Sequence, residues 1–302
     1  MGTPGFAVPS LEILISNGCT PVVVVTAPDK PRGRGQEILP TPVKSTALLH
    51  NIPLLQPESL SDPVFAEQVR AFNPDVMVVV AFRILPRSVF TIPRLGAFNL
   101  HASLLPKYRG AAPINWAIMN GEKETGVTSF LLQEKVDTGN ILLSARTPIK
   151  PEDDAGFLHD RLAEIGAEIV LHTVRLLEQG KSTPRPQDDI LATPAPKIFK
   201  EDCRIQWEKS AATIHNQVRG LSPYPAAFTT HNGKVVKIFR SSPLSEQSGN
   251  PGSIRQKDSR LLVSTGDSLI EIMELQQEGR KRMSSEEFLR GYSFQPGDSF
   301  GS

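Results

Sequence analysis

The chain has 302 residues, of which 39% are apolar and 22% are charged, and its formal net charge is +1. This length suits two domains better than one, and the composition is that of an ordinary globular protein. A charge so near zero excludes nucleic-acid binding through the field of the whole molecule, so any such binding must depend on local basic groups.

Other classes of protein are excluded by what the sequence lacks. The longest apolar run, VMVVVAF over residues 76–82, is far shorter than the roughly 20 residues that span a bilayer. No secretory leader is recognisable. Cys19 and Cys203 are isolated, which indicates a reducing compartment without a disulfide framework. Without CxxC or HExxH there is no metal signature. We therefore expect a cytoplasmic protein with no metal and no membrane partner.

The first two thirds of the chain alternate strand-like and helix-like segments. Short β-rich segments bounded by Gly, Pro or Asp predict strands over residues 21–28, 75–82, 96–101 and 126–132. The periodicity between and after them predicts helices over residues 9–17, 42–50, 61–72, 85–91, 112–120 and 155–179. Because the strands are continuously apolar, helices must cover both faces of the sheet, which is typical of a mostly parallel α/β sheet.

The amino-acid composition of the sequence changes after Gly180. Residues 181–197 are rich in Pro, Thr and charge, which indicates a linker. Residues 226–239 predict a hairpin with Asn232-Gly233 at its tip, and residues 260–275 predict a second one. We therefore expect a domain over residues 1–180, a linker over 181–203 and a small β-barrel domain over 204–302.

The amino terminus departs from the α/β pattern. A doubly wound sheet ordinarily opens with a strand, whereas this chain opens with MGTPGFAVPSLEIL, a turn followed by a helix. Removing a central strand would leave two unpaired edges inside the core. We therefore expect that the fold has a first strand and that the given sequence lacks it.

The stretch FNLHASLLPKYRG over residues 98–110 carries the strongest chemical signal. Ligands bind outside the carboxyl ends of strands in open α/β sheets, and Asn99 and His101 fall at such an end, two residues apart and on the same side. Asp137 in KVDTGN follows the next strand, and we expect it at the same edge of the sheet if that strand is a neighbour. A lone histidine would more often bond a backbone group, but the adjacent Asn99 and the stiff Leu-Leu-Pro turn favour a functional site.

Two other interpretations of these motifs are weak. DTG is also the triplet of aspartic proteases, but those need two triplets in an all-β body, and this α/β chain has one. A nicotinamide-binding site would need G-x-G-x-x-G after a strand, and neither GTPGFA nor GRGQE has that spacing.

Taken together, the motifs resemble the 10-formyltetrahydrofolate-dependent formyltransferases. The resemblance rests on FNLHASLLPKYRGAAPINWAI followed by VDTG, and further matching pieces include GTPGFAVPSLEIL, APDKPRGRGQEILPTPVK, DVMVVVAF and YPAAF. It implies a Rossmann-like catalytic domain and a carboxyl-terminal OB-like β-barrel. The basic loop and the second domain narrow it to the tRNA-acting members, whose reaction moves a formyl group to the α-amino group of methionine on initiator tRNA.

The resemblance also implies roles for single residues. Asn99 would stabilise the oxyanion, His101 would move protons, and Asp137 would orient the imidazole or accept the proton of the amine. The folate co-substrate would contact the turn formed by Ser103, Leu104, Leu105 and Pro106. The phosphates of the tRNA would contact Lys30, Arg32, Arg34, Lys44, Lys107 and Arg109. Weaker candidates for the body of the tRNA are Lys234, Lys237, Arg240 and residues 279–282. The same resemblance implies a monomer without a metal.

Two alternatives stay open. The chain could formylate another amine, on a sugar nucleotide or a ribonucleotide, although the basic loop argues against this. It could also be a non-catalytic RNA-binding relic that lost its first strand. The segment AFRILP over residues 81–86 is shorter than the corresponding stretch of this family, which puts the rim of the folate pocket in question.

Overall fold

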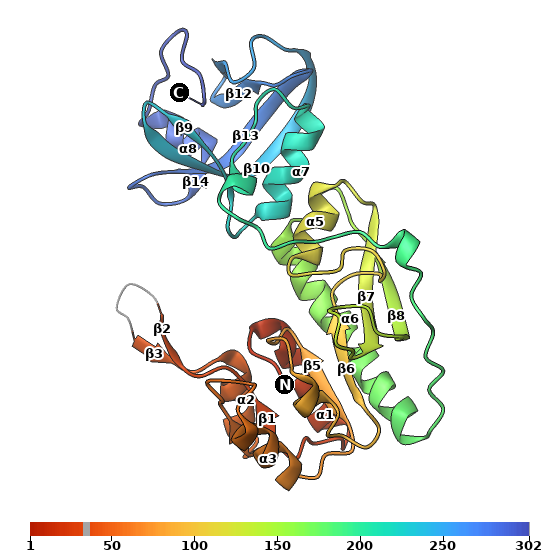
Figure 1. Cartoon of the computed structure of the whole chain (residues 1–302). Helices are drawn as coiled ribbons and strands as arrows, with labels where there is room; N and C mark the ends of the chain where they lie inside the picture. Colours follow the sequence, from red (N-terminus) through yellow and green to blue (C-terminus); the bar gives the residue numbers. More distant parts are fainter. Residues whose placement is uncertain (33–36, 302) are drawn as a thin grey trace. The chain divides into compact units, whose positions relative to one another are not determined.

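The computed structural model describes residues 1–32 and 37–301, and the chain divides into two units (Figure 1). The first unit holds Met1–Ala111, Glu124–Thr147 and His159–Ala195, and the second holds Ala112–Lys123, Pro148–Leu158 and Pro196–Ser302. Since each unit is assembled from three segments, the continuous domains drawn from the sequence stay a prediction.

The main sheet of the first unit combines parallel and antiparallel pairs. β5 (Met77–Val80) and β6 (Ala97–His101) pair in parallel. β7 (Glu124–Leu131) pairs with β6 in the antiparallel direction, and β8 (Ile141–Pro148) completes the order β5-β6-β7-β8. The predicted strands are therefore confirmed in this sheet, whereas β8 was not predicted.

Helices fill the segments between the strands and begin where their sequences cap them. α2 (Pro42–Leu49) and α3 (Pro63–Ala71) each start with a proline, after Thr41 and Asp62, whose side chains accept backbone N–H groups. α6 (Ala155–Glu178) runs along β6 to β8 (Figure 1), and the hydroxyls of Thr173 and Ser129 hydrogen bond at 2.8 Å. The shorter helices are η1 (Gly5–Ala7), α1 (Val8–Ser16) and α4 (Arg87–Phe90). The fold class of this unit, α/β with a Rossmann-like sheet, is confirmed.

The amino terminus lies within this layer of strands. β1 (Val24–Val25) and β4 (Leu54–Leu55) form a parallel pair. Met1 and Gly2 connect this pair to β5: Gly2 N donates to Val25 O at 3.0 Å, and the Met1 α-amino group donates to Val78 O at 2.7 Å. Gly2 also forms an isolated parallel bridge with Val80, so the first two residues lie between β1 and β5.

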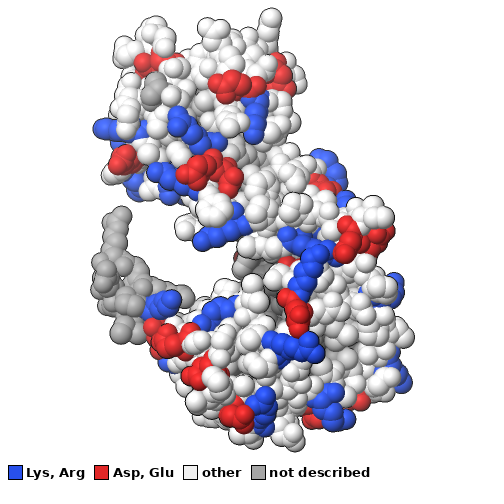
Figure 2. Space-filling view, in the orientation of Figure 1, with Lys and Arg blue, Asp and Glu red and all other residues white. Residues whose placement is uncertain are grey.

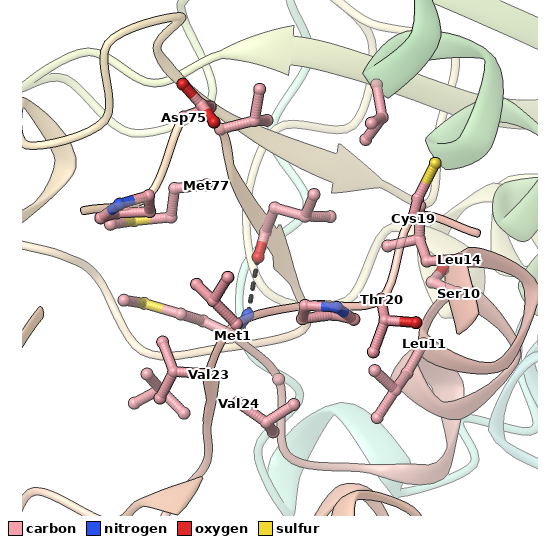
Figure 3. A pocket seen from close by; sticks show the side chains of 18 of the residues that line it. Met1, Ser10, Leu11, Leu14, Cys19, Thr20, Val23, Val24, Asp75 and Met77 are labelled. Carbon is pink, nitrogen blue, oxygen red and sulfur yellow. Dashed lines mark hydrogen bonds between the residues drawn. The ribbon is translucent and has the colours of Figure 1, made fainter. Parts of the chain in front are cut away.

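A cavity of about 450 Å³ lies next to Met1 (Figure 3). Its walls come from β1, β5 and the inner face of α1, and the labelled side chains include Leu11, Leu14, Val23 and Val24. None of Asn99, His101 and Asp137 lines it. The cavity is therefore a feature of the sheet and not of the predicted chemical site.

The second unit is built on an antiparallel sheet. Its strands are β9 (Ala227–His231), β10 (Lys234–Gln247), β11 (Ile254–Lys257), β12 (Arg260–Ser264), β13 (Ser268–Gln277) and β14 (Met283–Ser284). β9 and β10 form the predicted hairpin with Asn232-Gly233 at its tip, and β12 and β13 form the second predicted hairpin. The pairing runs β11-β12-β13-β10-β9 with β14 beside β13, so in the described chain the OB-like barrel stays open.

Helices complete the second unit. They are α5 (Pro113–Met119), α7 (Ala211–Leu221), α8 (Ser285–Arg290) and the short η3 (Glu201–Cys203). Asn115 Nδ2 on α5 donates to Gly220 O on α7 at 2.7 Å, which ties the two helices together. Fully buried apolar side chains from α7 and the sheet, such as Ile214 and Ile272, form the core.

Two kinds of feature are absent from residues 1–32 and 37–301. No helix there is both long enough and apolar enough to cross a bilayer. No cluster of three or more His, Cys, Asp or Glu side chains in that part of the chain has the arrangement of a metal site.

Candidate active site

His101 is the last residue of β6 and is almost fully buried, at 6% exposure. Its Nε2 lies 2.8 Å from Tyr108 O. A carbonyl oxygen can only accept, so Nε2 carries a proton and, in the neutral ring, Nδ1 keeps its lone pair. The ring also packs edge-on against Phe130 of β7, with 6.5 Å between the ring centroids. The imidazole is therefore held in one orientation with Nδ1 as the atom left for chemistry.

Asp137 faces that free nitrogen. Its Oδ2 lies 3.9 Å from His101 Nδ1 and accepts a hydrogen bond from Gly110 N at 2.9 Å. The separation is too long for a direct hydrogen bond, but a water molecule or a substrate amine to one side of the pair can contact both atoms. The carboxylate would also stabilise an imidazolium formed on His101.

The route by which Asp137 reaches His101 differs from the one expected. β7 is the neighbour of β6, but it runs antiparallel, so its end at Leu131 lies opposite Phe98 and not beside His101. The loop over residues 132–140 folds back along the sheet and brings Asp137 to the other end of β6. Asp137 itself adopts the left-handed conformation with φ of +56°, which is uncommon for a residue other than glycine.

Asn99 lies on β6 two residues before His101, between Val79 of β5 and Phe130 of β7. It is half-buried, and within the described part of the chain its side-chain amide has no hydrogen-bond partner. Since alternate residues of a strand share a face, the amide and the imidazole present their polar atoms on the same side of β6. The amide is thus available to a ligand at this end of the strand.

The turn over residues 103–106 is fastened to β7 by one side chain. Thr128 Oγ1 donates to Ser103 O at 2.7 Å and accepts from Leu105 N at 3.2 Å. The Ser103 hydroxyl donates to Lys107 O at 2.6 Å and is fully buried. The Ser103 side chain therefore stabilises the turn, so a ligand there would meet Leu104 and Pro106, which are partly exposed.

The predicted tRNA-contacting residues lie in different surroundings. Lys30 and Arg32 belong to β2 (Lys30–Arg32), which pairs with β3 (Glu37–Leu39) in a hairpin; Arg34 lies outside the described residues. Lys44 forms an ion pair with Asp29 and donates to Gln56 Oε1 at 2.9 Å. Hydrogen bonds from Lys44 and Gln56 hold the pKa of the Asp29 carboxyl below its usual value.

The other two predicted tRNA contacts flank Tyr108. Lys107 is exposed, whereas the Arg109 side chain is 14% exposed and donates to Asp189 Oδ1 at 2.7 Å. The hydrogen bond and charge of Arg109 lower the pKa of the Asp189 carboxyl. Arg109 thus has partners within the protein. Across the face drawn in Figure 2, basic and acidic side chains are interspersed.

Comparison with known proteins identifies the family. Residues 2–174 match the model of the formyl transferase family, and residues 197–293 match the model of the formyl transferase carboxyl-terminal domain. The methionyl-tRNA formyltransferase of Syntrophus aciditrophicus is 48% identical over 305 residues, covering 100% of this chain and 97% of that protein. The methionyl-tRNA formyltransferase of Chlorobium phaeovibrioides is 50% identical over 309 residues with the same coverage. This chain belongs to the methionyl-tRNA formyltransferase family.

Solved structures agree on the fold of this formyltransferase. The N-formyltransferase of Helicobacter canadensis, described in complex with folinic acid and dTDP-3-aminofucose, superposes with a TM-score of 0.69 at 23% identity. The superposition covers 90% of this chain and 96% of that protein. At this identity the likeness concerns the fold alone.

Sequence reasoning on this formyltransferase missed the residues that hold the site in place. Thr128 lies inside a predicted strand. Tyr108 lies between Lys107 and Arg109, whose charges predict a phosphate contact and give no sign of the backbone contact that Tyr108 makes. Gln187 and Thr193 lie in the stretch interpreted as a linker. None of them carries a local sequence signal, because each acts on a segment distant along the chain.

Proposed function

We propose that this formyltransferase moves the formyl group of 10-formyltetrahydrofolate to the α-amino group of methionine on initiator tRNA. Identity of 48–50% over the whole chain to methionyl-tRNA formyltransferases supports the choice of both substrates. The observation that carries the chemistry is the pair formed by His101 Nδ1 and Asp137 Oδ2, 3.9 Å apart at the end of β6 that also carries Asn99.

The reaction needs an electrophile, a base and a stabilised anion. The amine nitrogen attacks the formyl carbon, and the carbonyl electrons move to oxygen to form a tetrahedral oxyanion. The Asn99 amide donates a hydrogen bond to that oxyanion, an interaction worth about 3–4 kcal/mol at such sites. His101 Nδ1 takes the proton that the amine loses, directly or through water, while Nε2 stays bound to Tyr108 O. The anion collapses, the bond from carbon to N10 breaks, and N10 takes the proton from His101, which returns the ring to its neutral form.

Asp137 supports this proton transfer electrostatically. An imidazolium on His101 would face the Asp137 carboxylate across 3.9 Å in a mostly buried site, where opposite charges attract more strongly than in water. The Gly110 N–H keeps the carboxylate aimed at the ring.

The co-substrates are assigned to the surfaces beside this pair. The apolar turn at Leu104 to Pro106 forms a wall for the flat pterin of the folate, which is the family's formyl donor. Lys30, Arg32, Arg34, Lys44, Lys107 and Arg109 remain the predicted contacts of the tRNA phosphates, with Lys44 and Arg109 also engaged in ion pairs within the protein. A cytoplasmic, monomeric enzyme remains our expectation.

The test is formyl transfer from 10-formyltetrahydrofolate by the purified protein. Acceptors are methionine-charged initiator tRNA, methionine-charged elongator tRNA and an aminosugar nucleotide, with product detected by mass spectrometry. Transfer to the initiator tRNA alone is the expected result. Transfer to the aminosugar nucleotide alone, or no transfer by protein with a cooperative melting transition, would refute the proposal.

A further inference from the structure

The segment over residues 185–195, the strap, crosses the two loops that form the active site. Ile141 and Arg185 exchange backbone hydrogen bonds at 2.7 and 2.9 Å, next to the loop that carries Asp137. At its other end, Thr193 Oγ1 accepts from Tyr108 N at 2.9 Å, and Ala195 N donates to Arg109 O at 2.7 Å. A stretch whose composition indicates a linker is therefore bonded to the catalytic unit at both ends.

Gln187 lies between these two anchors, and its amide is fully used. Oε1 accepts from Arg109 Nε at 3.1 Å and from Nη2 at 2.7 Å, while Nε2 donates to Asp137 O at 2.9 Å and to Gly139 O at 2.8 Å. Since a guanidinium can only donate, the carbonyl end of the amide must face Arg109. The amino end is left for the loop, and it bonds two carbonyls of that loop at once.

The loop depends on such external bonds. Asp137 has the unfavourable φ of +56°, and the turn presses so closely on β7 that a Cβ on Gly139 would lie 1.6 Å from Leu131 O. Residues in sparsely populated conformations persist where their surroundings over-determine them. The loop must also fold back along β6 to place its carboxylate near His101, so rotation at residue 137 would move that carboxylate directly.

We propose that Gln187 is a positioning residue of the active site: its amide holds the backbone of Asp137 so that the carboxylate faces His101. Arg109 in turn fixes which way the amide points. The inference rests on the proposed function, because it assigns to the strap the geometry of the pair on which that function depends.

The substitution Gln187→Glu separates the two halves of the amide. A carboxylate still accepts from Arg109, so the strap keeps its anchor, but it cannot donate to Asp137 O and Gly139 O. Ile190→Glu is the matched control. Ile190 is 91% exposed on the same strap, so its replacement by Glu adds the same charge without removing a side-chain hydrogen bond. Gln187→Met, of similar size but without either polar group, is the second variant. Each protein is assayed for formyl transfer to initiator tRNA, with its melting curve measured beside it.

The expected result is a loss of about 10- to 100-fold in kcat for Gln187→Glu and Gln187→Met, with KM for tRNA and folate within about threefold, because a small misplacement near the reacting atoms costs rate more than binding. Ile190→Glu should match the wild type.

Three results would overturn the inference. They are wild-type kcat in both Gln187 variants, an equal loss in Ile190→Glu, and a loss in kcat explained wholly by unfolding at the assay temperature. The activity of the wild-type protein separates this test from the test of the proposed function. A folded wild type without formyl transfer refutes the proposed function. An active wild type with an equally active Gln187→Glu variant refutes only the role of Gln187.

Discussion

The buried amino group of Met1 should make the stability of this protein depend on pH. Burial lowers the pKa of this amine from 8.0 to about 5, because the charged form is removed from water. The hydrogen bond that the amine donates to Val78 O does not offset this loss of solvation. The unfolded chain therefore binds more protons than the folded one between pH 5 and 8, so the free energy of unfolding rises with pH across that window.

The size of the effect follows from the shift. Each pKa unit corresponds to about 1.4 kcal/mol, so a shift from 8.0 to about 5 amounts to about 4 kcal/mol between pH 5 and pH 8.5. Single domains unfold with about 5–15 kcal/mol, so the change is a large share of the total. Above pH 8 the amine is neutral in both states and its contribution to the slope disappears.

The assay is urea unfolding at half-unit steps from pH 5 to 8.5, with intact-mass measurement to establish that Met1 is retained. The comparison protein carries a few Val and Ile residues joined ahead of Met1, so that an uncharged amide N–H replaces the amine and apolar residues meet the walls of the cavity (Figure 3). The pKa of His215 is lowered by burial and by the charge of Arg219, which gives a slope of the same sign, but both proteins share it. The difference between the two proteins therefore isolates Met1. Equal slopes in both would refute the reasoning.

Three further predictions concern the site and its surroundings. Asn99→Ala, His101→Ala and Asp137→Ala should each lower kcat/KM for formyl transfer by about 10²-fold or more while the protein still melts cooperatively; a variant with near-wild-type turnover removes its residue from the mechanism. Thr128→Val deletes both hydrogen bonds of a fully buried hydroxyl, so urea unfolding should show a free energy of unfolding lower by about 1–3 kcal/mol. The transfer assay should show a raised KM for the folate, and an unchanged KM would argue that the turn over residues 103–106 does not contact the folate. Lys30→Ala should weaken tRNA binding and reduce the slope of log K against log salt by about one, and a slope equal to that of the wild type would argue against a phosphate contact.

Much of the fold could be predicted because local sequence patterns specify where its helices and strands form. The helices α1 to α6 and the strands β5, β6 and β7 lie within about two residues of the expected ranges, since apolar periodicity, prolines and capping residues act over a few positions. The hairpin tip at Asn232-Gly233 followed from turn chemistry alone. The identity of Asn99 and His101 as site candidates followed from their spacing at a strand end.

What the sequence by itself determined, then, is where elements begin and end and which residue types gather at the end of β6. Only the tertiary structure decided how Asp137 returns to His101 after an antiparallel strand. It also decided that Gln187, within the predicted linker, bonds a loop about 50 positions earlier. It also decided that Lys44 and Arg109 are paired within the protein and that the Met1 amine is buried between two strands. The reason is physical: local patterns report interactions between near neighbours along the chain, whereas these contacts join distant segments whose meeting depends on the packing of the whole unit.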